Sequence, residues 1–424
     1  MSTRYKFTYK GQEVNLSSDF DNGALAKIQE VDPNTFDIWP YEENEYQGGF
    51  IKMKPVDLDR SEPDSANFCF HFCVSNCKNK QLIFRFHLKE REKASDVSVV
   101  YANPDFPVYS YDGKDWQRME RKELSDDSAK NGWQIITTTQ RFREDKAYVA
   151  YQYPYSLDHL ENYLGTIRES PFLKIENAGE TTEGRLIPQV QITDEKFPIG
   201  KKKVAWFTGL QHCTELGAGW GLEGMIDFLL SDHSIAGKAR EQYIFKIIPI
   251  VNVDAVSEGR GRIHRTGRNL NREWEKTDPV MEVVMIKKTM NDWMAKGNPV
   301  DVFIDFHGFS VVQDQNWVFP VLPMETYNGK KVLQYKYLIE TIKKYIPFAS
   351  FSEQVSQGLV SGAVGREFGA LAMASDGYVY QWPEKGKTPD LSSYYQNASK
   401  VWELDEIKAC GANMIKALVE FAHS

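Results

Sequence analysis

The spacing of apolar residues along the chain changes near residue 160. Before that point, apolar and polar residues alternate along short runs. The apolar members of two such runs are Phe68, Phe70, Phe72, Val74, Leu82, Phe84, Phe86 and Leu88. A period of two is typical of strands with one buried face, and turn clusters such as 111–113 separate the runs. We therefore predict that residues 1–160 form a small N-terminal antiparallel β-sandwich domain.

After residue 160, continuous apolar runs alternate with segments of helical spacing. The runs 203–210, 243–251 and 300–308 are uninterrupted enough to be buried, parallel strands. Between them, residues 220–230 carry apolar side chains at helical spacing. We predict that residues 161–424 form an α/β domain, with a mixed, mainly parallel sheet flanked by helices.

Further helices are predicted around and after the third strand. Asp278 can cap one of them, with Pro279 in its first turn and Gly297 at its end. Its apolar stripe would contain Val283, Val284, Met290 and Trp293. Residues 332–346 and 404–421 also have the spacing of amphipathic helices.

Composition narrows the classes of partner and compartment. The chain has 424 residues, which suits two domains, and a net charge of −8, which argues against a nucleic-acid partner. The basic run 201–203 is read as a solvated strand entry. No apolar run approaches the roughly 18 residues of a membrane span, and the N-terminus lacks a signal-peptide pattern. Five cysteines do not make a disulfide framework, so we expect a cytoplasmic protein.

Candidate metal ligands follow two of the predicted strands. His212 and Glu215 come just after the strand 203–210, and His307 ends the strand 300–308. The carboxyl ends of such strands meet at one edge of a sheet, where sites gather. Two histidines and one carboxylate are a usual catalytic zinc set, and zinc lowers the pKa of a bound water to about 7. The pair His212 and Glu215 alone is a weak signal, because a histidine at a strand end is common.

Asp305 adds to this pattern. It lies two residues before His307, so both side chains point to the same face of the predicted strand. It can orient His307 through a hydrogen bond, or it can be a polar strand-end residue only.

A second group of potential ligands lies on the N-terminal strand that contains Cys69, His71 and Cys73. These three side chains share one face of the strand, which is compatible with a metal. The favoured interpretation is small residues packed under the sheet or at its edge, because metal sites normally draw ligands from several elements.

An arginine-rich segment spans residues 259–274. It contains five arginines and the amides of Asn269 and Asn271. A guanidinium beside an amide can hold a carboxylate at two points. A solvated basic loop is the alternative.

In combination, these motifs resemble a known family. The order of His-x-x-Glu, "IPIVNVDAV", Arg-x8-Asn-Arg and "DFHG" resembles the zinc carboxypeptidases of the carboxypeptidase A clan. The fit is closest to the cytosolic, deglutamylase-like carboxypeptidases, and the segments 17–25, 116–119 and 148–164 resemble their N-terminal sandwich and its junction.

The resemblance implies roles for individual residues. His212, Glu215 and His307 match the ligands of one Zn²⁺ per chain. Arg262 matches the arginine that stabilises the oxyanion. The pair that grips the terminal carboxylate of the peptide is matched by Asn271 and Arg272.

The chain also departs from the family pattern. Cys213 and Thr214 replace the usual Pro-Gly between the first two ligands, and Asn269 replaces an acidic residue. The basic residue that selects glutamate side chains has no clear counterpart. These differences leave the preferred terminal residue open.

The general base is the largest departure from the family. Ungapped counting assigns it to Asp376, whereas the local sequence pattern puts Ala374 there, which would mark a loss of the base. Glu367 is a third candidate, although its surroundings suggest a structural role. We favour Asp376. An aspartate is one methylene shorter than a glutamate, so we expect impaired activity.

The predicted function is that of a zinc metallocarboxypeptidase. It would remove the C-terminal residue, with glutamate as a candidate, from a peptide or protein tail through a zinc-activated water, with no nucleic-acid or membrane partner. Two alternatives stay open: an N-acyl amino acid amide hydrolase of the same clan, and a catalytically silent zinc-containing module that binds peptide tails. The oligomeric state is not predicted.

Overall fold

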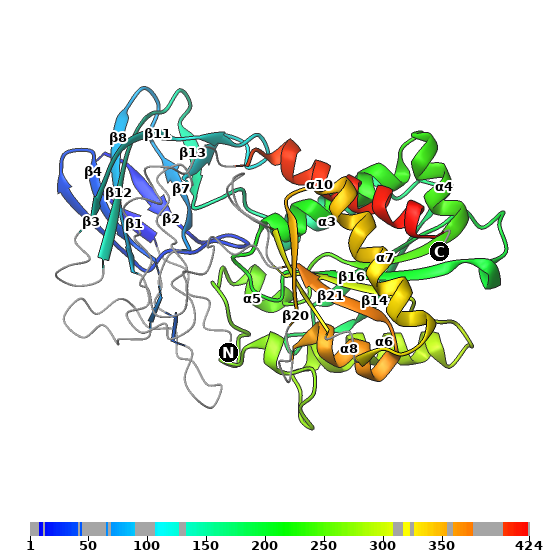
Figure 1. Ribbon diagram of the computed structural model, residues 1–424. Coiled ribbons are helices and arrows are strands. Elements are labelled where there is room, and N and C mark those ends of the chain that lie inside the picture. The colour runs from blue at the N-terminus through cyan, green and yellow to red at the C-terminus, as the bar shows by residue number, and fades with distance from the viewer. Residues whose placement is uncertain are drawn as a thin grey trace. The chain divides into compact units, whose positions relative to one another are not determined.

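The computed structural model describes most of the chain. The described residues are 8–11, 13–40, 43–44, 65–66, 69–89, 107–126, 133–307, 317–322, 326–353, 359–375 and 402–422. They belong to two compact units (Figure 1). The first unit contains the described residues up to Leu157 together with residues 255–269. The second contains residues 158–254 and the described residues from Leu270 onward.

Two large sheets form the first unit. One has six strands, all antiparallel, in the order β1 (Thr8–Lys10), β2 (Asn15–Ser17), β7 (His71–Ser75), β13 (Lys146–Ala150), β9 (Val108–Ser110) and β10 (Gln117–Arg118). The other has five, in the order β11 (Glu120–Asp126), β12 (Trp133–Arg141), β8 (Gln81–Lys89), β4 (Thr35–Trp39) and β3 (Lys27–Asp32). A short pair, β5 (Glu43–Asn44) and β6 (Ser65–Ala66), is separate. The pair β4 and β8 is parallel, which departs from the predicted antiparallel pattern.

The apolar residues of the two predicted alternating runs form the core between these two sheets. The apolar members that the structure describes are all buried: Phe70, Phe72, Val74, Leu82, Phe84, Phe86 and Leu88. The rings of Phe70 and Phe86 stack with centroids 4.1 Å apart, and those of Phe72 and Phe84 meet edge to face at 5.7 Å. Since each pair joins the segment of β7 to β8, the apolar faces of the two sheets pack against each other, as in a sandwich.

An eight-stranded mixed sheet forms the centre of the second unit. The order is β14 (Leu173–Glu180), β15 (Leu186–Ile192), β17 (Tyr243–Ile248), β16 (Lys203–Gly209), β18 (Val302–Phe306), β21 (Leu371–Ser375), β19 (Trp317–Val321) and β20 (Ala349–Glu353). Four of its seven neighbouring pairs are parallel, including β17–β16, β16–β18 and β18–β21 at its centre. This confirms the predicted mixed, mainly parallel sheet.

Helices cover this sheet on both sides. The helices of the second unit are α2 (Leu157–Ile167), α3 (Gly217–Leu230), α4 (Ser234–Gln242), α6 (Met281–Met294), α7 (Lys330–Tyr345), α8 (Val360–Phe368) and α10 (Leu404–Phe421), with short 3-10 turns η1 (Ile199–Lys201) and η2 (Leu270–Arg272). Helix α5 (Val253–Ser257) contains residues of both units. Helices α3 and α10 lie on one side of the sheet, and α6 and α8 on the other (Figure 1). None of the helices in the described part of the chain is long and apolar enough to cross a membrane.

Glycines allow α3 and α10 to approach closely. A Cβ atom on Gly411 would lie 1.9 Å from the carbonyl oxygen of Gly221, and one on Gly224 would lie 2.5 Å from the Cα atom of Lys408. Any side chain at these two positions would push the helices apart. The close packing fixes α3, whose N-terminus follows Glu215 by two residues.

Two details of α6 differ from the prediction. The helix begins at Met281 with Val280 as its N-cap, so the predicted cap at Asp278 is wrong. Val280 has an extended backbone and is buried, so the helical conformation begins only after it. Val284 is 38% exposed, whereas Val283 is fully buried. Neighbouring residues on a helix point about 100° apart, so the narrow buried stripe accepts only one of the two.

Candidate metal centre

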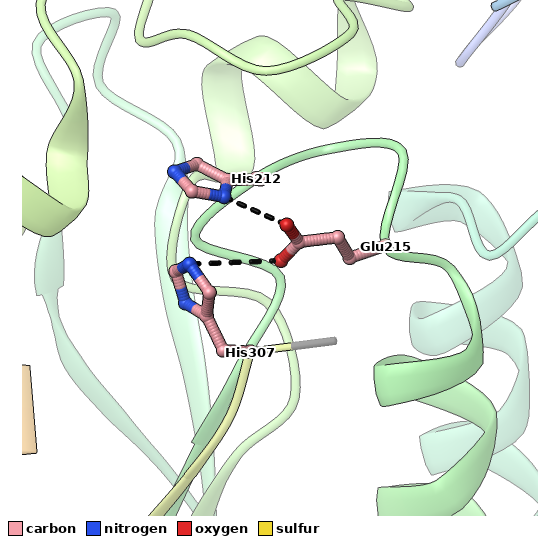
Figure 2. Close-up of side chains that lie close together, drawn as sticks. All are labelled: His212, Glu215 and His307. Carbon is pink, nitrogen blue, oxygen red and sulfur yellow. Dashed lines mark hydrogen bonds and ion pairs between the residues drawn. The ribbon is translucent and has the colours of Figure 1, made fainter. Parts of the chain in front are cut away.

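The three predicted ligands lie together at the carboxyl ends of two adjacent strands. His212 follows β16, His307 follows β18, and these strands pair in parallel with Gly209 opposite Phe306. One ligand atom from each of His212, Glu215 and His307 lies within 4.8 Å of the other two. The Nδ1 atom of His212 is 2.8 Å from Oε1 of Glu215, and the Nε2 atom of His307 is 3.9 Å from Oε2 of Glu215 (Figure 2).

A tight turn brings Glu215 back to His212. The amide of Glu215 donates to the carbonyl of His212 at 3.3 Å, and the amide of Ala218 donates to the carbonyl of Glu215 at 2.9 Å. The chain then enters α3. Both histidines are almost completely buried, whereas the side chain of Glu215 is 20% exposed. The two histidines are therefore enclosed by the protein, and the cluster is partly open on the side of the carboxylate.

A buried chain of hydrogen bonds orients His307. Its Nδ1 atom lies 2.9 Å from Oδ2 of Asp305, and Oδ1 of Asp305 accepts a hydrogen bond from Oγ1 of Thr208 at 2.5 Å. A carboxylate at Nδ1 keeps the proton on that nitrogen, which leaves the lone pair of Nε2 facing Glu215. The predicted orienting role of Asp305 is confirmed by this contact.

These residues fit a zinc ion. Two imidazole nitrogens and one carboxylate oxygen are the donors of a catalytic zinc site that keeps a fourth position open. Bonds of about 2.1 Å in a tetrahedron place donors roughly 3.4 Å apart, so side-chain shifts of about 1 Å would bring all three into range. Within the described residues, this is the only such cluster of three histidine, cysteine or acidic side chains.

The Cys69, His71 and Cys73 face of the N-terminal sheet forms no such cluster. His71 packs its ring edge to face on Phe20, with centroids 4.8 Å apart, and its Nδ1 atom lies 3.3 Å from Oδ1 of Asn22. The contacts support the interpretation of a packed face. All five cysteines of the chain fall within the described residues, and all are free thiols.

Asn271 lies directly beside the cluster. Its Nδ2 atom is 3.1 Å from Nε2 of His307, and its Oδ1 atom accepts a hydrogen bond from the amide of Val360 at 3.0 Å. Arg272 is exposed, and its Nη1 atom donates to the carbonyl of Asn271 at 3.0 Å. The side chain of Asn271 therefore lies at the edge of the site, and the guanidinium of Arg272 is bound to its backbone carbonyl.

Two other arginines of the segment 259–274 pair with Glu258. Arg260 forms a buried ion pair with Glu258 at 2.6 Å, and Arg265 lies 3.6 Å from the same carboxylate. Both therefore neutralise Glu258 within the first compact unit. Arg262 is half-buried and belongs to that unit too.

The strand that precedes the predicted base is β21. Ala374 is buried and pairs with Asp305 across the sheet, and the carbonyl of Ser375 accepts a hydrogen bond from the amide of His307 at 3.0 Å. Asp376 itself lies outside the described residues. Glu367 forms an ion pair with Lys287 at 2.5 Å, which supports the structural role expected for it.

The buried carboxylate of Glu223 stabilises α3, the helix that begins just after Glu215. Glu223 of α3 is bound at 2.7 Å by both His159 of α2 and Lys408 of α10. Burial raises the pKa of Glu223, but the hydrogen bonds and charges of His159 and Lys408 outweigh burial and hold it below the ordinary value. The charged network thus ties three helices together behind the site.

Four residues near the site escaped sequence reasoning. Thr208 supports Asp305, while Gln211, Asn252 and Trp274 surround the backbone just before His212. Thr208 lies near the end of a predicted strand, Asn252 lies in the motif "IPIVNVDAV" and Trp274 ends the segment 259–274, but no role at the site was predicted for any of them. Gln211, Asn252 and Trp274 act through contacts between segments far apart in sequence.

Comparisons with known proteins indicate the family of the chain. Residues 160–384, just over half of the chain, match the family model of zinc carboxypeptidases. Mouse cytosolic carboxypeptidase 6 is 26% identical over 397 residues, which cover 88% of this chain and 67% of that protein. Human cytosolic carboxypeptidase 1 is 25% identical over 332 residues, which cover 72% of this chain. The match spans only 26% of the length of the human protein.

Solved structures share the fold over nearly the whole chain. The metallo-carboxypeptidase of Burkholderia cenocepacia superposes with a TM-score of 0.69 at 22% identity, covering 97% of this chain and 99% of that one. The metallo-carboxypeptidase of Pseudomonas aeruginosa gives a TM-score of 0.64 at 17% identity, covering 96% and 98%. At such identities the likeness speaks for the fold. With the match to the family model, it follows that the chain belongs to the zinc carboxypeptidase family.

Proposed function

We propose that the protein is a zinc-dependent metallocarboxypeptidase that removes the C-terminal residue of a peptide or protein tail. The observation that carries this proposal is the convergence of His212, Glu215 and His307 within 4.8 Å, inside the segment that matches the family. When bound, zinc supplies a Lewis acid that acidifies water and polarises a carbonyl group. We propose one zinc ion per chain.

In this proposal, Asn271 and Arg272 hold the terminal carboxylate of the substrate. Arginine and amide groups suit a carboxylate because both donate hydrogen bonds, and the guanidinium adds charge. The contact of Asn271 with His307 supports the assignment, since a carboxylate held there would place the last peptide bond close to the cluster. Arg262 is proposed to stabilise the oxyanion through its guanidinium, as the family resemblance implies.

Asp376 is proposed as the general base that takes a proton from the attacking water and passes it to the leaving amine. The support for this assignment is the sequence match, together with Ser375, the preceding residue, whose carbonyl accepts a hydrogen bond from the amide of His307. An aspartate reaches less far than a glutamate, so slow turnover is part of the proposal.

The proposed substrate is a tail with a free carboxyl end, and glutamate is the candidate for its last residue. The arginines of the segment 259–274 carry positive charge, which suits an acidic substrate. We propose a cytoplasmic location. The support for it is that the five cysteines are free thiols and that the curated relatives are named cytosolic carboxypeptidases.

A silent zinc-containing module that binds tails without cutting them is the second candidate. The observation in its favour is Ala374, whose buried methyl group cannot accept a proton and which pairs with Asp305 across the sheet. Zinc binding and peptide affinity without turnover would select this candidate. In that case, glutamate introduced at position 374 or 376 should restore cleavage at the position of the lost base.

One assay separates these functions. Peptides that differ only in the last residue, and their C-terminal amides, are incubated with the protein, with and without a chelator. We expect chelator-sensitive release of the last residue from free-acid peptides, restored by added zinc and absent for the amides. Small N-acyl amino acids in the same assay test the amide hydrolase. If no residue is released from any peptide, the carboxypeptidase proposal fails.

A further inference from the structure

The backbone just before His212 adopts a conformation that its sequence does not favour. Leu210 has a φ angle of +51° and is completely buried. Bulky side chains rarely occupy the left-handed region, because the Cβ atom crowds the backbone there. Such a conformation persists only where the surrounding structure holds it. The turn therefore depends on contacts from elsewhere in the fold.

Three consecutive carbonyl groups in this turn are held by one neighbouring segment. The carbonyl of Gly209 accepts from the amide of Val251 at 2.9 Å, and that of Leu210 accepts from the amide of Asn252 at 3.2 Å. The third bond comes from a side chain: Nδ2 of Asn252 donates to the carbonyl of Gln211 at 3.0 Å. The residues of the segment, 251–252, follow β17, which is the parallel neighbour of β16.

The contact made by Asn252 differs from the other two because it depends on residue identity. Any residue other than proline can supply a backbone amide, but only a side chain of suitable length can reach the carbonyl of Gln211. Asn252 and Gln211 are both completely buried. Because water does not reach this carbonyl group, loss of the carboxamide would leave it without a donor at the residue immediately before His212.

The same turn is joined to the segment of Asn271. The Oε1 atom of Gln211 accepts a hydrogen bond from Nε1 of Trp274 at 2.8 Å. Trp274 is buried and follows Asn271 by three residues, and Asn271 contacts His307. The backbone before His212 is thus connected to the surroundings of His307 through the buried side chains of Gln211 and Asn271.

We propose that Asn252 is a positioning residue of the metal centre. By holding the carbonyl of Gln211, it keeps Leu210 left-handed and keeps Nδ1 of His212 beside Glu215. Asn252 does not touch the metal or the substrate. The proposal rests on the proposed function only in taking zinc as the ion that this cluster binds.

The first test measures metal binding rather than catalysis. Zinc affinity is determined for the whole protein by competition with a chromophoric chelator, and the absorption spectrum of bound Co²⁺ reports the geometry of the site. Asn252→Ala should bind zinc about 10 to 100-fold more weakly, as for other residues that orient a metal ligand, and should alter the cobalt spectrum. Wild-type affinity with an unchanged cobalt spectrum would overturn the proposal.

Tyr243→Phe is the matched control. Tyr243 is the first residue of β17, the strand that precedes Asn252, and its hydroxyl donates to the carbonyl of Leu418 at 2.7 Å in a fully buried position. The control therefore also removes one buried hydrogen bond from a side chain to a carbonyl, at the opposite end of the strand. Its zinc affinity should stay within twofold of the wild-type value.

Two variants at Leu210 test the same idea if Asn252→Ala does not fold. Glycine accepts a positive φ angle, whereas valine retains an apolar side chain but strongly resists it. Leu210→Gly should lower the melting temperature yet keep the zinc affinity, and Leu210→Val should lose at least tenfold in affinity. If the zinc affinities of the two variants fall in proportion to their melting temperatures, regardless of the residue at position 210, the proposal is overturned. If the wild-type protein itself binds no zinc, the proposed function fails instead.

Discussion

His307 and Asp305 form a buried pair in which Nδ1 of the imidazole lies 2.9 Å from Oδ2 of the carboxylate. The two residues lie at the carboxyl end of β18, on the same face of the sheet. Thr208, on the adjacent strand, donates to the other carboxylate oxygen. The pair therefore determines both the orientation of His307 and the nitrogen that carries its proton.

Removing the charge of Asp305 should weaken metal binding. In Asp305→Asn, the amide can present a donor to Nδ1 and favour the wrong tautomer of His307. We expect zinc affinity to fall about 10 to 100-fold. Asp301→Asn, at the amino end of the same strand, is the control, because the amide oxygen can still accept from Val204 as the carboxylate does at 2.7 Å. Equal zinc affinities for the two variants would contradict the assigned role of Asp305.

Asp376→Asn should abolish most of the turnover without affecting the metal. General-base catalysis typically contributes about 10² to 10⁴-fold in rate, so kcat should fall by that factor while zinc affinity stays the same. Ala374→Ser, two residues earlier, should leave kcat almost unchanged. If Asp376→Asn cleaves peptides at the wild-type rate, Asp376 is not the base.

Arg272→Ala should weaken the recognition of a free carboxyl end. A hydrogen bond to a charged group contributes about 1.5 to 3 kcal/mol, which corresponds to a rise in KM of about 10 to 150-fold. The variant should also discriminate less between peptide acids and amides. Arg366→Ala is the control, since its guanidinium pairs with Glu275 on the surface. An unchanged KM for Arg272→Ala would exclude it from the carboxylate clamp.

Glu223 should make stability depend on pH in the acidic range. Its pKa is below the ordinary value in the folded protein, so its contribution is complete above the unfolded pKa of about 4.3 and is lost as pH falls through the lower folded value. Glu223→Gln should lower the free energy of unfolding by about 1 to 3 kcal/mol at pH 7. This gap between the variant and the wild-type protein should narrow below about pH 4. Urea unfolding at several pH values measures the gap, with exposed Glu161→Gln as control. A gap that is constant from pH 7 to pH 3 would contradict this assignment.

Elements with strong periodicity were predictable from the sequence. Helix α10 spans Leu404–Phe421, the predicted range, because its apolar stripe is continuous and its Glu403 and Glu406 form a capping box at the N-terminus. Strand β17 ends at Ile248, earlier than predicted, and Pro249 follows it. Apolar side chains continue to Val251, but proline cannot donate to a sheet ladder.

The candidate ligands were predictable because they follow strand ends, whereas their supports were not. Leu210 has a positive φ angle, which rules based on local sequence expect only of glycine or asparagine. The side chain that supports this turn is that of Asn252, which follows Leu210 by 42 residues (252 − 210). Contacts of this kind depend on the pairing of β16 with β17, so the motif that contains Asn252 does not by itself predict them.

A zinc titration of the whole protein tests whether His212, Glu215 and His307 hold one ion. We expect one tightly bound zinc per wild-type chain, and none in His212→Ala or His307→Ala at the same free zinc concentration. Full zinc occupancy in both folded variants, or no zinc in the wild-type protein, would contradict this expectation.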